Sequence, residues 1–184
     1  MNITEAEING LFIIEPRVFE DQRGHFFESF RQNVFEEAGL DITFIQDNQS
    51  KSQYGVIRGL HYQRDPYAQS KLIRVVEGEI YDVALDMRKG SPHFGKWFGI
   101  HLSADNKKQL FIPAGFAHGF SVLSETAIVI YKCDEYYMKD YEGGISLADP
   151  DLQIDWKIEK GKEIVSEKDR NQPRLKDSEY VFGG

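Results

Sequence analysis

Short runs of β-branched and aromatic residues recur along the chain, and turn-forming residues separate them. In the run over residues 80–86, Tyr81, Val83 and Leu85 share one face of an extended segment, and the even-numbered residues share the other. This two-residue period is typical of a strand with one face against a core. Such runs predict strands over residues 11–14, 42–46, 56–62, 71–76, 80–86, 98–102, 109–112, 119–123 and 127–133.

Helix signals are few. Residues 31–39 contain good helix formers around Phe35 and end in Gly39, which suits a left-handed cap, so a short helix is expected there. A second helical stretch is possible over residues 164–170. Many short strands without alternating helices favour an all-β fold, an antiparallel jelly-roll barrel with a few short helices. No repeat or linker divides the chain, so we expect a single domain over residues 1–184.

Charge and composition restrict the possible partners. The 184 residues carry a net charge of −8, so binding to nucleic acid or to an anionic membrane is not expected. Cys133 is the only cysteine, which rules out an internal disulfide and fits a reducing compartment. The start of the chain lacks a basic and apolar leader, and the apolar run over residues 127–131 is too short to span a bilayer. We therefore expect a cytoplasmic protein.

The first candidate for chemistry is the polar cluster over residues 55–63. Strict alternation places His61 and Gln63 on one face of a strand and Arg58 on the other. A bulge at Gly59 would instead turn Arg58 and His61 into one cavity. The alternative for this segment alone is a hydrogen-bonded structural histidine beside an exposed arginine.

The second candidate is the turn over residues 112–120. Its Pro113, Gly115 and His118 match the P-x-G-x-x-H motif of the cupin superfamily, and Gly55 with His61 resembles the partner motif G-x5-H-x-H. Gln63 occupies the position of the second metal-binding histidine. An amide is a poor replacement for imidazole around a transition metal, so no bound metal is expected.

Two further features have ordinary structural explanations when each is taken alone. Alternation over residues 127–131 turns Tyr131 toward a barrel interior, yet a tyrosine in an apolar strand is most often a core residue. The charged run over residues 166–170 is of a kind that usually lies on a solvated surface.

Taken together, the motifs resemble a much more specific family, that of the dTDP-4-dehydrorhamnose 3,5-epimerases. The matching segments run nearly from end to end, in the same order and with the same spacing. They are residues 23–28, 46–48, 58–63, 71–74, 112–120, 131–133 and 166–169. The resemblance implies a cupin jelly roll without metal or organic cofactor. It also implies a homodimer in which N-terminal segments exchange contacts, and a dTDP-linked 4-keto-6-deoxysugar as substrate.

The resemblance also assigns roles. It implies that His61 is the base, that Asp169 orients the His61 ring, and that Tyr131 is the acid on the opposite face of the sugar. Lys71 would stabilise the charge that develops on the C4 oxygen. The positions implied to contact substrate are Arg23, Phe26, Glu28, Gln46, Asn48, Arg58, Lys71, His118, Glu142 and Lys168.

Three alternatives to a double epimerase stay open on sequence alone. An epimerase that inverts only C3 or only C5 would use the same His61 and Tyr131, and the chain departs from the family pattern over residues 138–148. A metal-dependent cupin oxygenase would require a stoichiometric metal. A sugar-binding or regulatory module would have no need of a base opposed by an acid.

Overall fold

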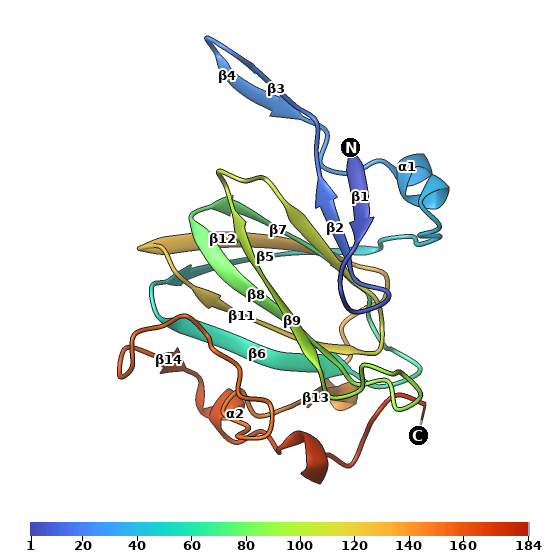
Figure 1. The fold of residues 1–184 in the computed structure, drawn as a ribbon, viewed down its shortest axis with the longest axis vertical. Coiled ribbons are helices and arrows are strands. Elements are labelled where there is room, and N and C mark those ends of the chain that lie inside the picture. Colours follow the sequence, from blue (N-terminus) through green and yellow to red (C-terminus); the bar gives the residue numbers. More distant parts are fainter. Residues whose placement is uncertain (184) are drawn as a thin grey trace.

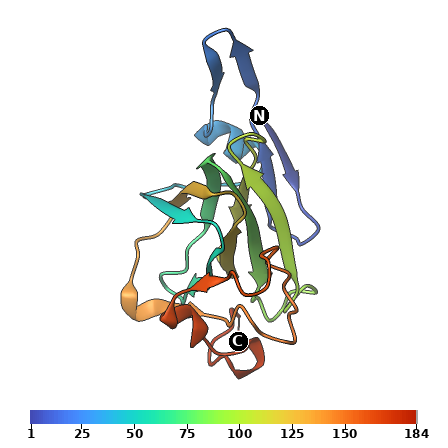
Figure 2. The ribbon, with the colours of Figure 1, turned by 90° about the vertical axis from the view of Figure 1, so that its left-hand side faces the viewer.

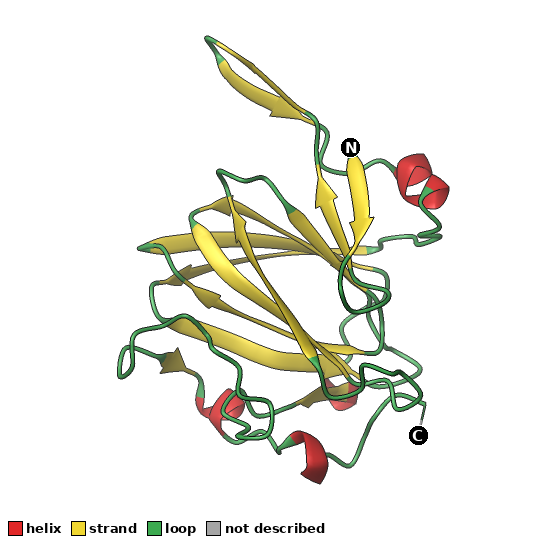
Figure 3. Ribbon diagram, in the orientation of Figure 1, coloured by secondary structure: helices red, strands yellow, loops and turns green. Residues whose placement is uncertain are grey.

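The computed structural model describes residues 1–183, and strands with only short helices make up its regular structure (Figure 3). Two sheets pack face to face into a jelly-roll barrel (Figures 1 and 2). The first sheet has the spatial order β1 (Asn2–Glu5), β2 (Phe12–Glu15), β10 (Gln109–Ile112), β7 (Lys71–Glu77), β12 (Thr126–Cys133) and β5 (Gln46–Gln53). The second has the order β13 (Glu142–Gly144), β6 (Val56–Gln63), β11 (Phe116–Val122), β8 (Glu79–Asp86) and β9 (Trp97–Ser103). The predicted all-β class is confirmed.

The remaining elements lie around this barrel. Neighbouring strands in both orders are antiparallel, and β14 (Ile164–Val165) adds to β6 in parallel. The helices are α1 (Gln32–Glu37), α2 (Glu167–Arg170) and the 3₁₀ turns η1 (Lys139–Tyr141) and η2 (Leu175–Asp177). No helix within residues 1–183 is long and apolar enough to cross a membrane.

A hairpin of β3 (Val18–Asp21) and β4 (Gly24–Phe27) projects from the barrel (Figures 1 and 2). In the described part of the chain these two strands pair only with each other. Two of the hairpin's aromatic side chains are largely exposed, Phe19 at 52% and Phe26 at 70%. Both side chains are therefore accessible for contact with another molecule.

Buried apolar side chains lie on both faces of the second sheet. Between the two sheets, apolar side chains such as Ile73, Ile80 and Leu110 are fully buried. On the outer face of the second sheet, the C-terminal segment runs below β6 (Figure 1), and its Trp156 belongs to a second buried apolar cluster that includes Leu85. Burial of these apolar faces is the main favourable contribution to folding. It therefore stabilises the strands even where they place polar side chains in the interior.

Most predicted strands compare closely with those observed, but β1, β3, β4 and β13 were not predicted. The expected strand over residues 42–46 is wrong, because β5 begins only at Gln46 and runs through the polar residues to Gln53. The predicted helix over residues 31–39 forms as α1, followed by Gly39 at φ +81°. Of the possible helix over residues 164–170, only residues 167–170 are helical, as α2, and Ile164–Val165 form β14.

The bulge predicted at Gly59 is present. Arg58 pairs with Phe120 and His61 pairs with His118, so three steps along β6 match two steps along β11. A Cβ on Gly59 would lie 2.5 Å from the Cα of Gly119, and Gly59 has φ +136°. Only glycine tolerates both this conformation and this close approach. The extra residue lets Arg58 and His61 project to the same side of the sheet.

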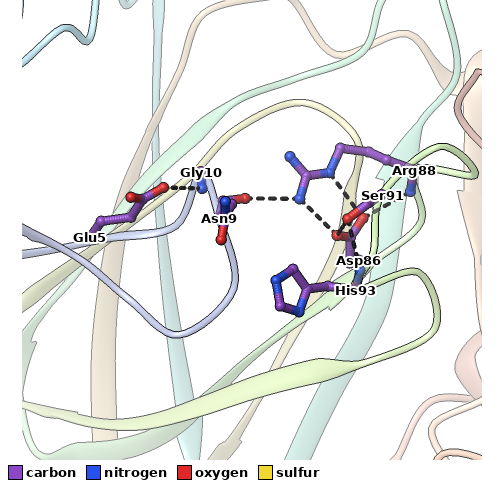
Figure 4. A network of polar contacts seen from close by, with 7 residues as sticks. All are labelled: Glu5, Asn9, Gly10, Asp86, Arg88, Ser91 and His93. Carbon is purple, nitrogen blue, oxygen red and sulfur yellow. Dashed lines mark hydrogen bonds and ion pairs between the residues drawn. The ribbon is translucent and has the colours of Figure 1, made fainter.

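A polar network fixes the turn between β1 and β2 to the end of β8 (Figure 4). Arg88 forms a two-pronged ion pair with the buried carboxylate of Asp86, at 2.7 and 2.9 Å, and donates to the backbone oxygen of Asn9 at 2.8 Å. Ser91 donates to the same carboxylate at 2.6 Å. Because every charged group here is paired, the network has a structural role and leaves no group for a ligand.

Candidate active site

One cavity of about 220 Å³ opens between the two sheets. Its lining residues are Gln46, Asn48, His61, Tyr62, Gln63, Gln69, Lys71, Tyr131, Tyr137 and Glu142. This volume is below the roughly 300–1,000 Å³ of sites that enclose a whole drug-sized ligand. The cavity therefore suits one small ring of a larger ligand.

The second sheet contributes a histidine with an oriented ring. His61 on β6 places its Nε2 atom 2.7 Å from Oδ1 of Asp169. Asp169 is buried on α2, and its own backbone N–H donates to the capping hydroxyl of Ser166 at 3.1 Å. Since Nε2 is engaged by the carboxylate, Nδ1 is the ring nitrogen free to accept a proton.

The pKa of Asp169 keeps it charged. Burial alone would raise the pKa of this carboxyl, but hydrogen bonds from His61, the Gly59 backbone and Ser166 outweigh burial and lower it. The anionic form stabilises a protonated His61 ring and fixes its tautomer. The pair thus forms a base held in one orientation.

The first sheet contributes Tyr131, on the wall opposite His61. It lies on β12 between Asn48 of β5 and Ile73 of β7, and it lines the cavity. Burial raises the pKa of the Tyr131 phenol, and the nearby Arg58 guanidinium offsets part of that rise. The phenol therefore stays protonated at neutral pH and is available as a proton donor.

Lys71 is the cavity's cation. It stands at the start of β7, and its ammonium makes no side-chain hydrogen bond or ion pair within residues 1–183. Burial lowers the pKa of Lys71 from its ordinary value, while Asp82 and Glu142 are among the charges that offset part of that effect. A partly desolvated amine without a partner suits the stabilisation of an oxyanion.

Glu142 stands at one side of the cavity with two partners. Its Oε2 atom accepts from the Tyr137 hydroxyl at 2.9 Å and pairs with Nζ of Lys168 at 2.6 Å. Burial alone would raise the pKa of Glu142, but the contacts with Lys168 and Tyr137 outweigh burial and lower it. The carboxylate is therefore charged. Lys168 does not line the cavity itself and is connected to it by this ion pair.

His118 and Arg58 lie next to the cavity without lining it. His118 is directly opposite His61 on the neighbouring strand, and its Nε2 atom lies 2.9 Å from Oδ2 of the fully buried Asp82. Arg58 donates from Nε to the Ser52 hydroxyl at 3.1 Å.

Three predicted substrate residues lie apart from the cavity, on the hairpin or directly after it. Arg23 is 85% exposed and pairs with Asp21 at 2.6 Å. Phe26 is exposed on β4, and Glu28 pairs with Arg31 at 2.7 Å. Within one chain, therefore, the structure does not bring Arg23, Phe26 or Glu28 together with His61.

The donor set does not fit a metal. Within the described residues no group of three or more His, Cys, Asp and Glu side chains is placed to hold one. His61 and His118 each have a ring nitrogen on a carboxylate. The amide nitrogen of Gln63 donates to the backbone oxygen of Tyr67, and its amide oxygen accepts from the backbone N–H of Met138.

Sequence reasoning missed four residues of this site: Asp82, Tyr62, Gln69 and Tyr137. For Asp82 a signal existed, because a carboxylate shares the core-facing positions of residues 80–86 with Ile80 and Ala84. Such a carboxylate must have a buried partner, and that partner is His118.

Fold and site together define a cupin-type enzyme built for proton transfer. A family model for dTDP-4-dehydrorhamnose 3,5-epimerase matches residues 5–177. The dTDP-4-dehydrorhamnose 3,5-epimerase of Shigella flexneri is 53% identical over 99% of this chain and 100% of its own length. The chain belongs to the dTDP-4-dehydrorhamnose 3,5-epimerase family and is an isomerase.

Solved structures agree with this assignment. The dTDP-4-dehydrorhamnose 3,5-epimerase of Elizabethkingia anophelis NUHP1 is 52% identical with a TM-score of 0.94, covering 98% of this chain and 99% of its own. The dTDP-6-deoxy-D-glucose-3,5-epimerase of Legionella pneumophila Philadelphia 1, in complex with dTDP-4-keto-L-rhamnose, is 48% identical with a TM-score of 0.91. That match covers 95% of this chain and 93% of the Legionella chain.

Proposed function

We propose that this chain converts dTDP-4-dehydro-6-deoxy-D-glucose to dTDP-4-dehydro-L-rhamnose by inverting C3 and C5, in the biosynthesis of dTDP-L-rhamnose. One observation carries the proposal. His61 on the second sheet, held by Asp169 of α2, lines a single cavity with Tyr131 and Lys71 of the first sheet. Inversion at a carbon beside a ketone needs this arrangement, a base on one side of the ring and an acid on the other.

Each inversion proceeds through an enolate. Nδ1 of His61 removes the proton next to the C4 ketone, and the electron pair moves onto the C4 oxygen. The Lys71 ammonium stabilises this oxygen as it becomes negative. The Tyr131 hydroxyl then donates a proton to the opposite face of the same carbon, and the ketone re-forms with inverted configuration.

The nucleotide must lie outside the cavity, because the cavity suits only one ring. We propose that the chain forms a homodimer in which the β3–β4 hairpin of each protomer reaches the site of its partner. The projection of the hairpin and the exposure of Phe26 support this arrangement (Figure 1). Arg23 would then bind diphosphate with its fork of donors, and Phe26 would stack on the thymine.

Complementation between two inactive variants tests this exchange. In mixed dimers of Arg23→Ala and His61→Asn chains, one of the two sites combines an intact His61 with an intact Arg23 from the other protomer. We expect mixing to restore activity well above that of either variant alone, as assayed by NMR after unfolding and refolding the chains together. Failure of a mixed dimer, verified by mass, to regain activity would show that Arg23 serves the site of its own chain.

The lowered pKa of Lys71 predicts the alkaline side of the pH profile. Its charge is present below its pKa and is lost as the pH rises through it, so kcat should fall at a pH below the ordinary lysine value of about 10.4. Arg stays charged, so Lys71→Arg should have a lower kcat whose alkaline fall moves to higher pH. The control is Lys132→Arg, an exposed β12 position paired with Asp47. An unmoved alkaline fall in Lys71→Arg would contradict the role of Lys71.

Solvent deuterium tests the reaction itself. We expect the purified protein, stripped of metal and supplied with dTDP-4-keto-6-deoxyglucose in deuterium oxide, to introduce deuterium at both C3 and C5. Label at one carbon only would indicate an epimerase of a single centre. Absence of label would contradict the proposed function, and loss of activity on metal removal would indicate metal-dependent chemistry.

We further propose that the chain works in the cytoplasm as one domain over residues 1–184. Its cysteine, Cys133, is a buried free thiol, which favours a reducing compartment. One core cluster joins both sheets, which supports a single domain. Gly184, the last residue of that domain, lies outside the described residues.

A further inference from the structure

The cavity is bounded on one side by a segment without regular structure. After β12 ends at Cys133, residues 134–138 cross from the first sheet toward β13 of the second, and we call them the wall segment. Within residues 1–183, the main-chain groups of residues 134–137 form no hydrogen bond with another main-chain group. Their main-chain groups must therefore find partners among side chains.

Three glutamine side chains supply those partners. Gln69 donates to the backbone oxygen of Glu135 at 2.7 Å. Gln46 on β5 accepts from the backbone N–H of Tyr137 at 2.9 Å. These contacts come from the first sheet and from the loop before β7, and Gln63 on the second sheet completes the set. The wall segment is thus held from both sides of the cavity.

Gln63 is the central contact. It is 4% exposed, and its amide nitrogen donates to the backbone oxygens of Tyr67 at 2.6 Å and Tyr136 at 3.1 Å. Its amide oxygen accepts from the backbone N–H of Met138 at 2.6 Å. Both donors and the acceptor of this amide are occupied by backbone groups. Gln63 therefore fixes the wall segment on either side of Tyr137.

The position of Tyr137 affects the rest of the site. Its hydroxyl donates to Glu142, which pairs with Lys168, and both Tyr137 and Glu142 line the cavity that contains His61. The phenol of Tyr137 has a single partner, so the backbone contacts on either side determine where it lies. Displacement of the wall segment would open the cavity beside the proposed base.

We propose that Gln63, assisted by Gln46 and Gln69, is a positioning residue that holds the wall segment against the sugar ring of the substrate. The proposal rests on the proposed function, since it takes the cavity to be the sugar subsite. Gln63 does not touch the reacting carbons; it acts through Tyr137 and Glu142. Gln63 occupies the cupin position that otherwise suits a metal ligand, and in this chain it positions one wall of the cavity.

Gln63→Glu tests this role with almost no change of shape. The carboxylate keeps the contact with the Met138 N–H but turns oxygen atoms toward the carbonyls of Tyr67 and Tyr136. We expect KM for the dTDP-linked keto sugar to rise about tenfold, the factor expected from loss of one or two buried hydrogen bonds. We expect Kd for dTDP, measured by calorimetry, to stay within about twofold, because dTDP lacks the keto sugar that would contact the wall segment.

A buried hydrogen bond elsewhere in the same sheet provides the control. The Ser121 hydroxyl on β11 donates to the backbone oxygen of Trp156 at 2.5 Å, on the outer face and away from the cavity. Ser121→Ala should lower the melting temperature and leave both KM and the Kd of dTDP unchanged. The proposal would be overturned if Gln63→Glu changed the Kd of dTDP as much as the KM of the keto sugar. It would also be overturned if a folded Gln63→Glu variant changed neither value.

Two further measurements keep the test decisive. If Gln63→Glu does not fold, Gln69→Glu at a partly exposed position tests the same wall through its contact with Glu135, with a smaller rise in KM expected. Calorimetry with the dTDP-linked keto sugar separates the two proposals. If the wild-type chain incorporates no deuterium but binds this sugar more tightly than Gln63→Glu does, the proposed reaction fails while the role of Gln63 stands.

Discussion

His61→Asn should lower kcat by about 10³-fold or more, in line with the roughly 10²–10⁴-fold that a general base contributes. The Asn side chain cannot take a proton from carbon, and its amide ends near the position of Nδ1, too short to replace the Nε2 contact with Asp169. Deuterium incorporation should therefore fall at C3 and C5 together, because one base serves both carbons in the proposed mechanism. Kd for dTDP should change little, since the proposed mode of binding leaves the nucleotide outside the cavity.

His101 provides a matched control for this variant. Its Nδ1 atom lies 2.7 Å from Oε1 of Glu79, so it forms a histidine–carboxylate pair on β9 and is outside the cavity. His101→Asn should leave kcat unchanged. Deuterium incorporation in His61→Asn at more than about a tenth of the wild-type rate would assign the base to another residue.

Tyr131→Phe should separate proton removal from inversion. Without the hydroxyl, the acid proposed on the wall opposite His61 is lost, so formation of the inverted sugar should fall by about 10²–10³-fold. His61 can still remove a proton and return a deuteron to the same face. We therefore expect deuterium to enter with retention of configuration faster than inverted product forms, a difference that NMR of recovered substrate measures.

Tyr180→Phe is the control for loss of a phenol. The Tyr180 hydroxyl donates to Asp65 at 2.7 Å, outside the cavity, so kcat for inversion should be unchanged. Equal losses of exchange and inversion in Tyr131→Phe would mean that Tyr131 assists proton removal and is not the acid. Normal inversion in this variant would remove Tyr131 from the mechanism.

Much of the fold was predictable because apolar alternation reports directly on a strand with one face in a core. In strand β8, Tyr81, Val83 and Leu85 share one side of the sheet as their spacing predicts, but Ile80 and Ala84 on the other side are buried too, so the prediction of a single core-facing side is wrong there. Strand β5 gave no such signal. Gln46 and Asn48 face the polar cavity, while Asp47 and Gln49 are exposed, so no apolar alternation exists along it.

The candidate residues were predictable in kind, but their arrangement was not. Strict alternation placed Arg58 and His61 on opposite faces, and Gly59 only allowed for the bulge that brings them to one side of the strand. Pairing of His61 with Asp169, 108 positions later, follows from the docking of α2 on β6. Long-range contacts of this kind depend on how sheets and segments pack, and local spacing carries no record of them.

By itself, the sequence predicted most of the strands of the barrel, the residues that are candidates to carry protons and charge, and the resemblance to one epimerase family. Tertiary structure alone decided which of these groups share a cavity. It places His61 and Tyr131 on opposite sheets and leaves Arg23 on a hairpin apart from both. The physical reason is that strand patterning is a local property of the chain, whereas burial, pKa shifts and opposed walls arise only when distant strands pack together.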